Sequence, residues 1–156
     1  MQDALNTLSL ILDESPELIN KISTEEFDRK PAPGKWSKKE LLGHLIDSAF
    51  NNLQRFIRAQ YEDIPMIKYH QDEWVKLNNY HSYDWATVLD LWISMNRHII
   101  HVIDSADPNS LQRLCRTSVD GEAKTIEWLF IDYVKHLQYH LGQVLPEYSR
   151  KVEVYP

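Results

Sequence analysis

Residues 37–61 read SKKELLGHLIDSAFNNLQRFIRAQY and carry the clearest helix signal in the chain. Ser37 and Glu40 have the spacing of a capping box, in which each side chain binds the backbone N–H of the other residue at a helix start. Apolar residues then recur on one helical face, at Leu42, Ile46, Ala49 and Leu53. We therefore predict a helix from Ser37 to about Tyr61 that buries this face.

Three further segments have the apolar periodicity of long helices. They run from about Asp3 to Ile22, from Asp84 to about Ser105, and from about Thr125 to Leu145. Ser15-Pro16 interrupts the first segment as a cap followed by a first-turn proline, so we expect a kink or a restart there. Asp107-Pro108 and Pro146 predict where the other two helices end.

The connections between these helices differ in character. Lys30 to Lys35 contains two prolines and a glycine and predicts a loop. Glu62 to Ser82 is polar and aromatic, and we interpret it as one long connection, which in a compact domain is usually functional. Asp120-Gly121, between Cys115 and Lys124, predicts a small β-hairpin with a tight turn. The sequence thus predicts an all-α four-helix bundle with one long crossover, as a single domain over residues 1–156.

Composition limits the function. The chain has 43% hydrophobic and 26% charged residues, which is typical of a soluble globular protein. Its net charge of −6 argues against binding along nucleic-acid phosphates. No apolar run reaches the length of about 18 residues that a membrane span needs. The N-terminus lacks a signal-peptide pattern, and the lone Cys115 forms no internal disulfide, so we expect a cytoplasmic protein in which Cys115 serves packing.

Two of the seven histidines lie one helical turn apart on the last predicted helix. His136 and His140 project the same way, as a metal ion requires, and lie at the edge of the apolar face. A hydrogen-bonded pair at the rim of the core explains them equally well. His98 and His101 lie opposite the apolar face of their helix, which favours a solvated role. His70 and His81 fall in the long connection, where nothing indicates a role.

A polar face runs along the helix predicted from Ser37. It consists of His44, Ser48, Asn51 and Arg55. Such a face is either solvated or the wall of a polar cavity. Periodicity does not separate the two, and a solvated face is the commoner case.

Two charged residues of this helix also have two interpretations each. Asp47 either orients a neighbouring imidazole or is a surface charge. Arg55 either binds a carboxylate of a ligand or forms a surface salt bridge with Glu62 or Asp63.

Several motifs in order carry a family resemblance. They are Trp36-Ser37, His44-Leu45-Ile46-Asp47-Ser48, Asn51, Arg55-Phe56, the acidic Pro65-x-Ile67-x-Tyr69 connection ending in Trp74, and His136-x-x-x-His140. This set, from Trp36 to Val144, resembles the DinB-like superfamily, especially its YfiT-like branch of bacillithiol transferases and metal-dependent hydrolases. Members of the branch often carry two acids directly after this tyrosine and a further histidine at the position of Gln143. Here His70 and Gln71 follow the tyrosine, and a shift of register would place Asp72 in the acidic position.

The resemblance implies a site and an activity. Carried over onto this sequence, the metal ligands are His44, His136 and His140, and the polar face with Asp47, Ser48, Asn51 and Arg55 lines a cavity beside one divalent ion, zinc or nickel. The implied activity is the transfer of a low-molecular-weight thiol of the bacillithiol type to an electrophile. A hydrolase that uses metal-bound water, or a non-catalytic metal- or partner-binding bundle in a stress response, are the alternatives. The family also implies a homodimer.

Overall fold

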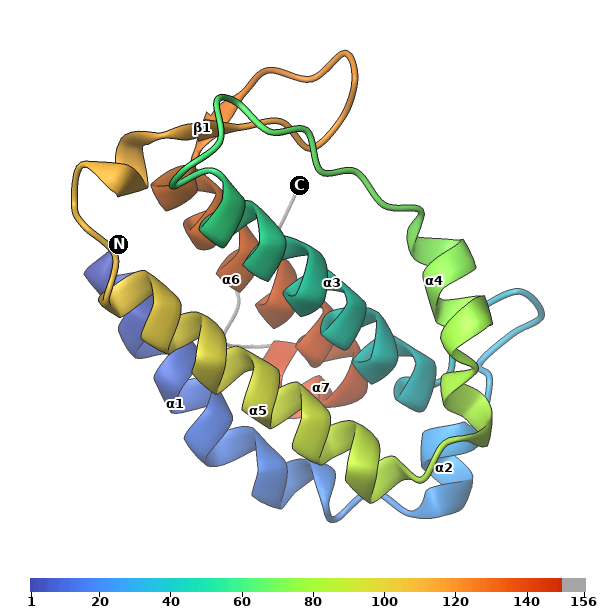
Figure 1. The fold of residues 1–156 in the computed structure, drawn as a ribbon. Helices are drawn as coiled ribbons and strands as arrows, with labels where there is room; N and C mark the ends of the chain where they lie inside the picture. Colours follow the sequence, from blue (N-terminus) through green and yellow to red (C-terminus); the bar gives the residue numbers. More distant parts are fainter. Residues whose placement is uncertain (150–156) are drawn as a thin grey trace.

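The computed structural model describes residues 1–149 and forms a four-helix bundle, as the sequence predicts (Figure 1). The long helices are α1 (Gln2–Ile19), α3 (Lys38–Arg58), α5 (Trp85–Asp104) and α6 (Ile126–Val144). Helices α5 and α6 each pack against both α1 and α3, so α1 and α3 occupy opposite corners. In Figure 1, α3 and α5 run in the same direction. The chain must therefore cross back along the bundle between them.

The predicted start of α3 is confirmed. The Ser37 side chain accepts a hydrogen bond from the Glu40 backbone N–H, and Glu40 Oε2 accepts one from the Ser37 N–H at 2.8 Å. The helix ends at Arg58, three residues before the expected Tyr61. This cap fixes where the first two turns of α3 lie, and these turns carry His44.

One expected helix boundary, the restart at Pro16, is wrong. Helix α1 continues through Pro16 to Ile19 without a restart, and the Ser15 hydroxyl donates to the Ile11 carbonyl instead of capping a new helix. Pro146 ends α6 but opens a short helix of its own, α7 (Pro146–Ser149). A five-residue helix that the sequence did not indicate, α2 (Thr24–Asp28), is capped by Ser23.

The crossover between α3 and α5 is more ordered than an extended connection. It contains α4 (Gln71–Asn78) and a 3-10 turn, η1 (Tyr80–Ser82). Val75 is buried, and Trp74 packs on Phe50 of α3 and on Tyr69. The interpretation of this segment as one long connection is therefore corrected, because these apolar contacts stabilise a helix within it.

A small hairpin precedes α6, as predicted. Strands β1 (Leu114–Cys115) and β2 (Lys124–Thr125) pair antiparallel after a 3-10 turn, η2 (Ser110–Gln112). The eight residues between the strands form an open loop, so Asp120-Gly121 is not the expected tight turn. Among the described residues, no helix combines the length and apolarity needed to cross a membrane.

Candidate metal centre

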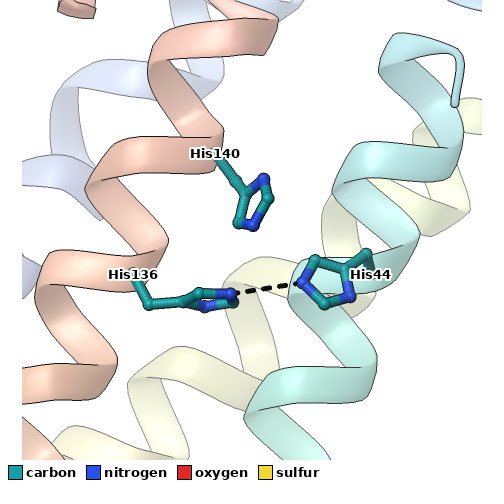
Figure 2. Close-up of side chains that lie close together, drawn as sticks. All are labelled: His44, His136 and His140. Atoms are coloured by element: carbon teal, nitrogen blue, oxygen red, sulfur yellow. Dashed lines mark hydrogen bonds between the residues drawn. The ribbon is translucent and has the colours of Figure 1, made fainter. Parts of the chain in front are cut away.

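Three imidazoles from two facing helices converge inside the bundle. His44 comes from α3, and His136 and His140 come from consecutive turns of α6 (Figure 2). One ring nitrogen from each lies within 4.8 Å of the others. Nε2 of His44 and Nε2 of His136 are 3.3 Å apart and share a hydrogen bond. The third ring faces both, with centroids 4.8 Å from His44 and 4.6 Å from His136.

Burial keeps these rings neutral. His44 is fully buried, and its desolvation, together with the nearby His136 and His140, lowers its pKa to about 3. Burial also lowers the pKa of His136, to about 4, and that of His140. All three rings therefore offer nitrogen lone pairs at neutral pH, which is the form in which histidine binds a metal.

Neighbouring side chains fix two of the rings. The Trp36 ring packs against His44 with centroids 5.0 Å apart. Nδ1 of His140 hydrogen-bonds Oε1 of Gln143 at 3.2 Å. An acceptor on the second ring nitrogen sets the tautomer that leaves Nε2 free for a metal.

The donor set fits a divalent ion. Two nitrogens bound at about 2.05 Å to a tetrahedral ion are about 3.3 Å apart. The Nε2 atoms of His44 and His136 already have this separation. Three histidines leave one position of such an ion open, which is the arrangement of catalytic rather than structural zinc sites.

The polar face of α3 is not solvated, which corrects the commoner interpretation. Ser48, Asn51 and Arg55 are all buried together with His44. The Asn51 side chain donates a hydrogen bond to the Asp47 backbone carbonyl at 2.8 Å, so its amide group is bound within α3 itself.

The expected surface salt bridge of Arg55 is wrong as well. Its Nε and Nη2 donate to the Ile67 carbonyl, and its Nη1 donates to Oδ1 of Asn52. Arg58 forms the ion pair with Glu62 instead. Burial lowers the pKa of Arg55, and no carboxylate among the residues of the described chain forms an ion pair with it.

Asp47 is neither a surface charge nor hydrogen-bonded to an imidazole. It is 1% exposed and accepts hydrogen bonds from the Tyr80 hydroxyl at 2.7 Å and from Asn78 at 3.0 Å. Burial raises its pKa to about 6. Asp47 thus ties the end of α4 and the following turn η1 to α3. No sequence pattern indicated Tyr80 as its partner.

Two cavities flank the histidines. The inner cavity, of about 230 Å³, reaches His136 and is lined by Ser48, Asn52, Arg55 and Tyr69 among others. The outer pocket, of about 940 Å³, reaches His140, with Trp36, Asp72 and Gln143 among its walls. Asn52 and Tyr69 were missed from the sequence, although Asn52 lies one turn from Ser48.

The remaining candidates lie elsewhere. Cys115 is buried, as expected for packing, and its thiol donates to the Pro65 carbonyl; burial raises its pKa. His98 and His101 are exposed on α5, as predicted, and His70 and His81 are exposed in the crossover. None of these four histidines belongs to the cluster.

A family model settles the wider relationship, because the model of the DinB superfamily matches residues 7–144. The chain belongs to the DinB superfamily. A curated superfamily relative from Halalkalibacterium halodurans is 27% identical over 141 residues, which cover 90% of this chain and 75% of the relative. Another, from Oceanobacillus iheyensis, is 23% identical over 90% of this chain and 83% of its own. Both carry the provisional name of metal-dependent hydrolase.

Solved structures show the same fold. YfiT from Bacillus subtilis, described as a probable metal-dependent hydrolase with an unusual four-helix bundle topology, superposes with a TM-score of 0.83 at 20% identity. The match covers 96% of this chain and 86% of YfiT. A mycothiol-dependent maleylpyruvate isomerase superposes with a TM-score of 0.70 at 13% identity, over 90% of this chain and 60% of that one.

Proposed function

We propose that this protein is a metal-dependent thiol S-transferase. His44, His136 and His140 hold one divalent ion, zinc or nickel, and a low-molecular-weight thiol of the bacillithiol type is transferred to an electrophile. The observation that carries the proposal is the convergence of three neutral imidazoles, one buried and two partly buried, between two cavities. A structural site needs no cavity, whereas a catalytic one needs access for its substrates.

The chemistry at such a centre follows from its ligands. A divalent ion held there lowers the pKa of the thiol or water that binds it and so supplies a nucleophile near neutral pH. The chain supplies the rest. Trp36 and Gln143 restrain two of the imidazoles, and the packed bundle excludes bulk water from His44. Cys115 takes no part, because its thiol is buried away from the cluster.

Arg55 is our candidate for binding a carboxylate of the thiol. Its guanidinium lines the inner cavity, which also reaches His136. Its hydrogen bonds to Ile67 and Asn52 hold the side chain in place without neutralising its charge. A buried cation whose described hydrogen bonds all go to neutral acceptors favours an anionic ligand. Ser48 and Asn52 add polar groups to the same wall, whereas Asn51 supports the helix.

The two acids have different proposed roles. Asp47 is a positioning residue, because it holds Tyr80 and Asn78 of the crossover on α3. Asp72, in the first turn of α4, lies on the wall of the outer pocket that also contains His140. We assign it to substrate contact there.

A hydrolase is the second candidate, favoured by the provisional names of the curated relatives. The two reactions share the ion and the cavities but differ in the nucleophile. The transferase requires an added thiol, whereas the hydrolase turns over esters or amides without one. The fold shared with a mycothiol-dependent isomerase favours the thiol.

The test is metal-dependent conjugation of a bacillithiol-type thiol to chlorodinitrobenzene. We expect a rate that persists to lower pH than that of the free thiol, because the bound thiol ionises more readily. His140→Ala should abolish the enhancement and Cys115→Ser should retain it. Turnover of esters without thiol would favour the hydrolase, and inactivity of the metal-loaded protein on broad panels of thiols and esters would contradict both.

A further inference from the structure

The outer pocket is far more basic than the protein around it. Four of its lining side chains are cations, namely Arg29, Lys30, Lys35 and Lys38, and only two, Glu26 and Asp72, are acids. The whole chain has the opposite balance, with 17 basic and 23 acidic residues. A local excess of positive charge in a cleft attracts ligands of negative charge.

Two of these cations are already paired and two are not. Lys30 binds Glu40 at 2.8 Å, and Lys38 binds Glu26 at 2.7 Å. Arg29 and Lys35 form neither an ion pair nor a side-chain hydrogen bond within residues 1–149. The pocket therefore has two positive charges available to a ligand.

The backbone holds this part of the pocket in a defined shape. Gly34 has φ +74, a conformation that residues with a side chain rarely adopt, and Pro31 and Pro33 restrict the rest of the loop. The same loop ends at Trp36, whose ring packs on His44. A stiff loop thus carries Lys35 on one side and contacts the histidine cluster on the other, which lowers the entropic cost of binding.

We propose that the outer pocket takes a small organic dianion, with Arg29 and Lys35 binding its anionic groups and its reactive end directed to His140. This names the substrate class of the proposed enzyme and rests on that proposed function. Carboxylate and phosphate groups share the required charge and hydrogen-bonding capacity. The pocket volume of about 940 Å³ suits a molecule larger than the inner cavity of about 230 Å³ admits.

The test is calorimetric titration of the metal-free, full-length protein at low ionic strength with two probe anions, succinate and inorganic phosphate. Succinamide, which has the shape of succinate without its charge, is the ligand control and should not bind. Arg29→Gln/Lys35→Gln should weaken anion binding about tenfold, because each exposed charge contact contributes roughly three- to fivefold.

Arg97→Gln/Lys68→Gln is the matched control variant. It removes the same charges at exposed positions outside the pocket and should bind the anions as the wild type does. The tighter of the two probes identifies the group that the pocket recognises. Equal binding in the two double variants, or binding of neither anion, would overturn the proposal. Because no metal is present in the titration, this result is independent of whether the three histidines hold an ion.

Discussion

Gly43→Ala is predicted to destabilise the protein through one contact between the crossover and α3. Gly43 lies in the helix beneath the ring of Tyr80. A Cβ at this position would lie 2.7 Å from Cε2 of that ring and closer still to Cγ and Cδ2. Because these approaches include Cγ at the base of the ring, a small tilt does not relieve them, and the Tyr80 side chain must leave its place. Its hydroxyl would then lose the hydrogen bond to Asp47.

The magnitude follows from three contributions. Overpacking of this kind costs about 1–3 kcal/mol. Loss of the hydrogen bond to a buried carboxylate costs about 1–3 kcal/mol more. Alanine is the better helix former and offsets about 1 kcal/mol. We expect Gly43→Ala to lower the free energy of unfolding by about 1–5 kcal/mol, measured by urea denaturation.

A double-mutant cycle separates this cause from a general defect. In a Tyr80→Ala background the ring is gone, so Gly43→Ala should be neutral or stabilise by up to about 1 kcal/mol. The reasoning is refuted if Gly43→Ala leaves the urea midpoint unchanged in the wild-type background. It is refuted equally if the same loss occurs without the Tyr80 ring.

Three further predictions concern charge, binding and assembly. The pKa of Asp47 is raised by burial, so its contribution to stability is present at low pH and lost as the pH rises through about 6. The free energy of unfolding of Asp47→Asn should therefore rise by about 1–2 kcal/mol relative to that of the wild type between pH 5 and pH 8, measured by urea titration. A difference that does not change with pH would contradict this. Arg55→Lys should raise KM for the thiol with little change in kcat, because the guanidinium binds the carboxylate equally in the ground and transition states. An unchanged KM in steady-state kinetics would show that Arg55 does not bind the thiol. The protein should sediment as a homodimer. Its interface should bury more than about 1,000 Å² of surface between helix faces that carry exposed apolar residues such as Phe50 and Ile57. A single-chain mass at micromolar concentration would refute the dimer.

Sequence patterns predicted the elements that depend on residues close together in the chain. The capping box of Ser37 and Glu40 fixed the start of α3, and the apolar period located the four long helices. Helix α4 was missed because its apolar face is only about one turn long, and its stability comes from contacts of Trp74 with Phe50 and Tyr69. Such contacts depend on the tertiary structure and leave no period in the sequence.

The site was only partly predictable for a similar reason. The spacing of His136 and His140 indicated a shared direction, but only the resemblance pointed to His44 as their partner. Periodicity shows which residues share a face of α3 and says nothing of what covers that face, so the burial of Ser48 and Arg55 came from the fold. Glu62 lies four residues after Arg58, a helical spacing that explains why it pairs with Arg58 and not with Arg55.

The most direct test of the account is the metal content of protein purified without chelator, affinity resin or added metal. We predict about one divalent ion per chain in the wild type, by mass spectrometry of the intact and acid-digested protein. His44→Ala, His136→Ala and His140→Ala should each lower the affinity by orders of magnitude, whereas His98→Ala and His101→Ala should retain the ion. A wild-type content near zero, or a His140→Ala variant as fully loaded as the wild type, would contradict the three-histidine centre.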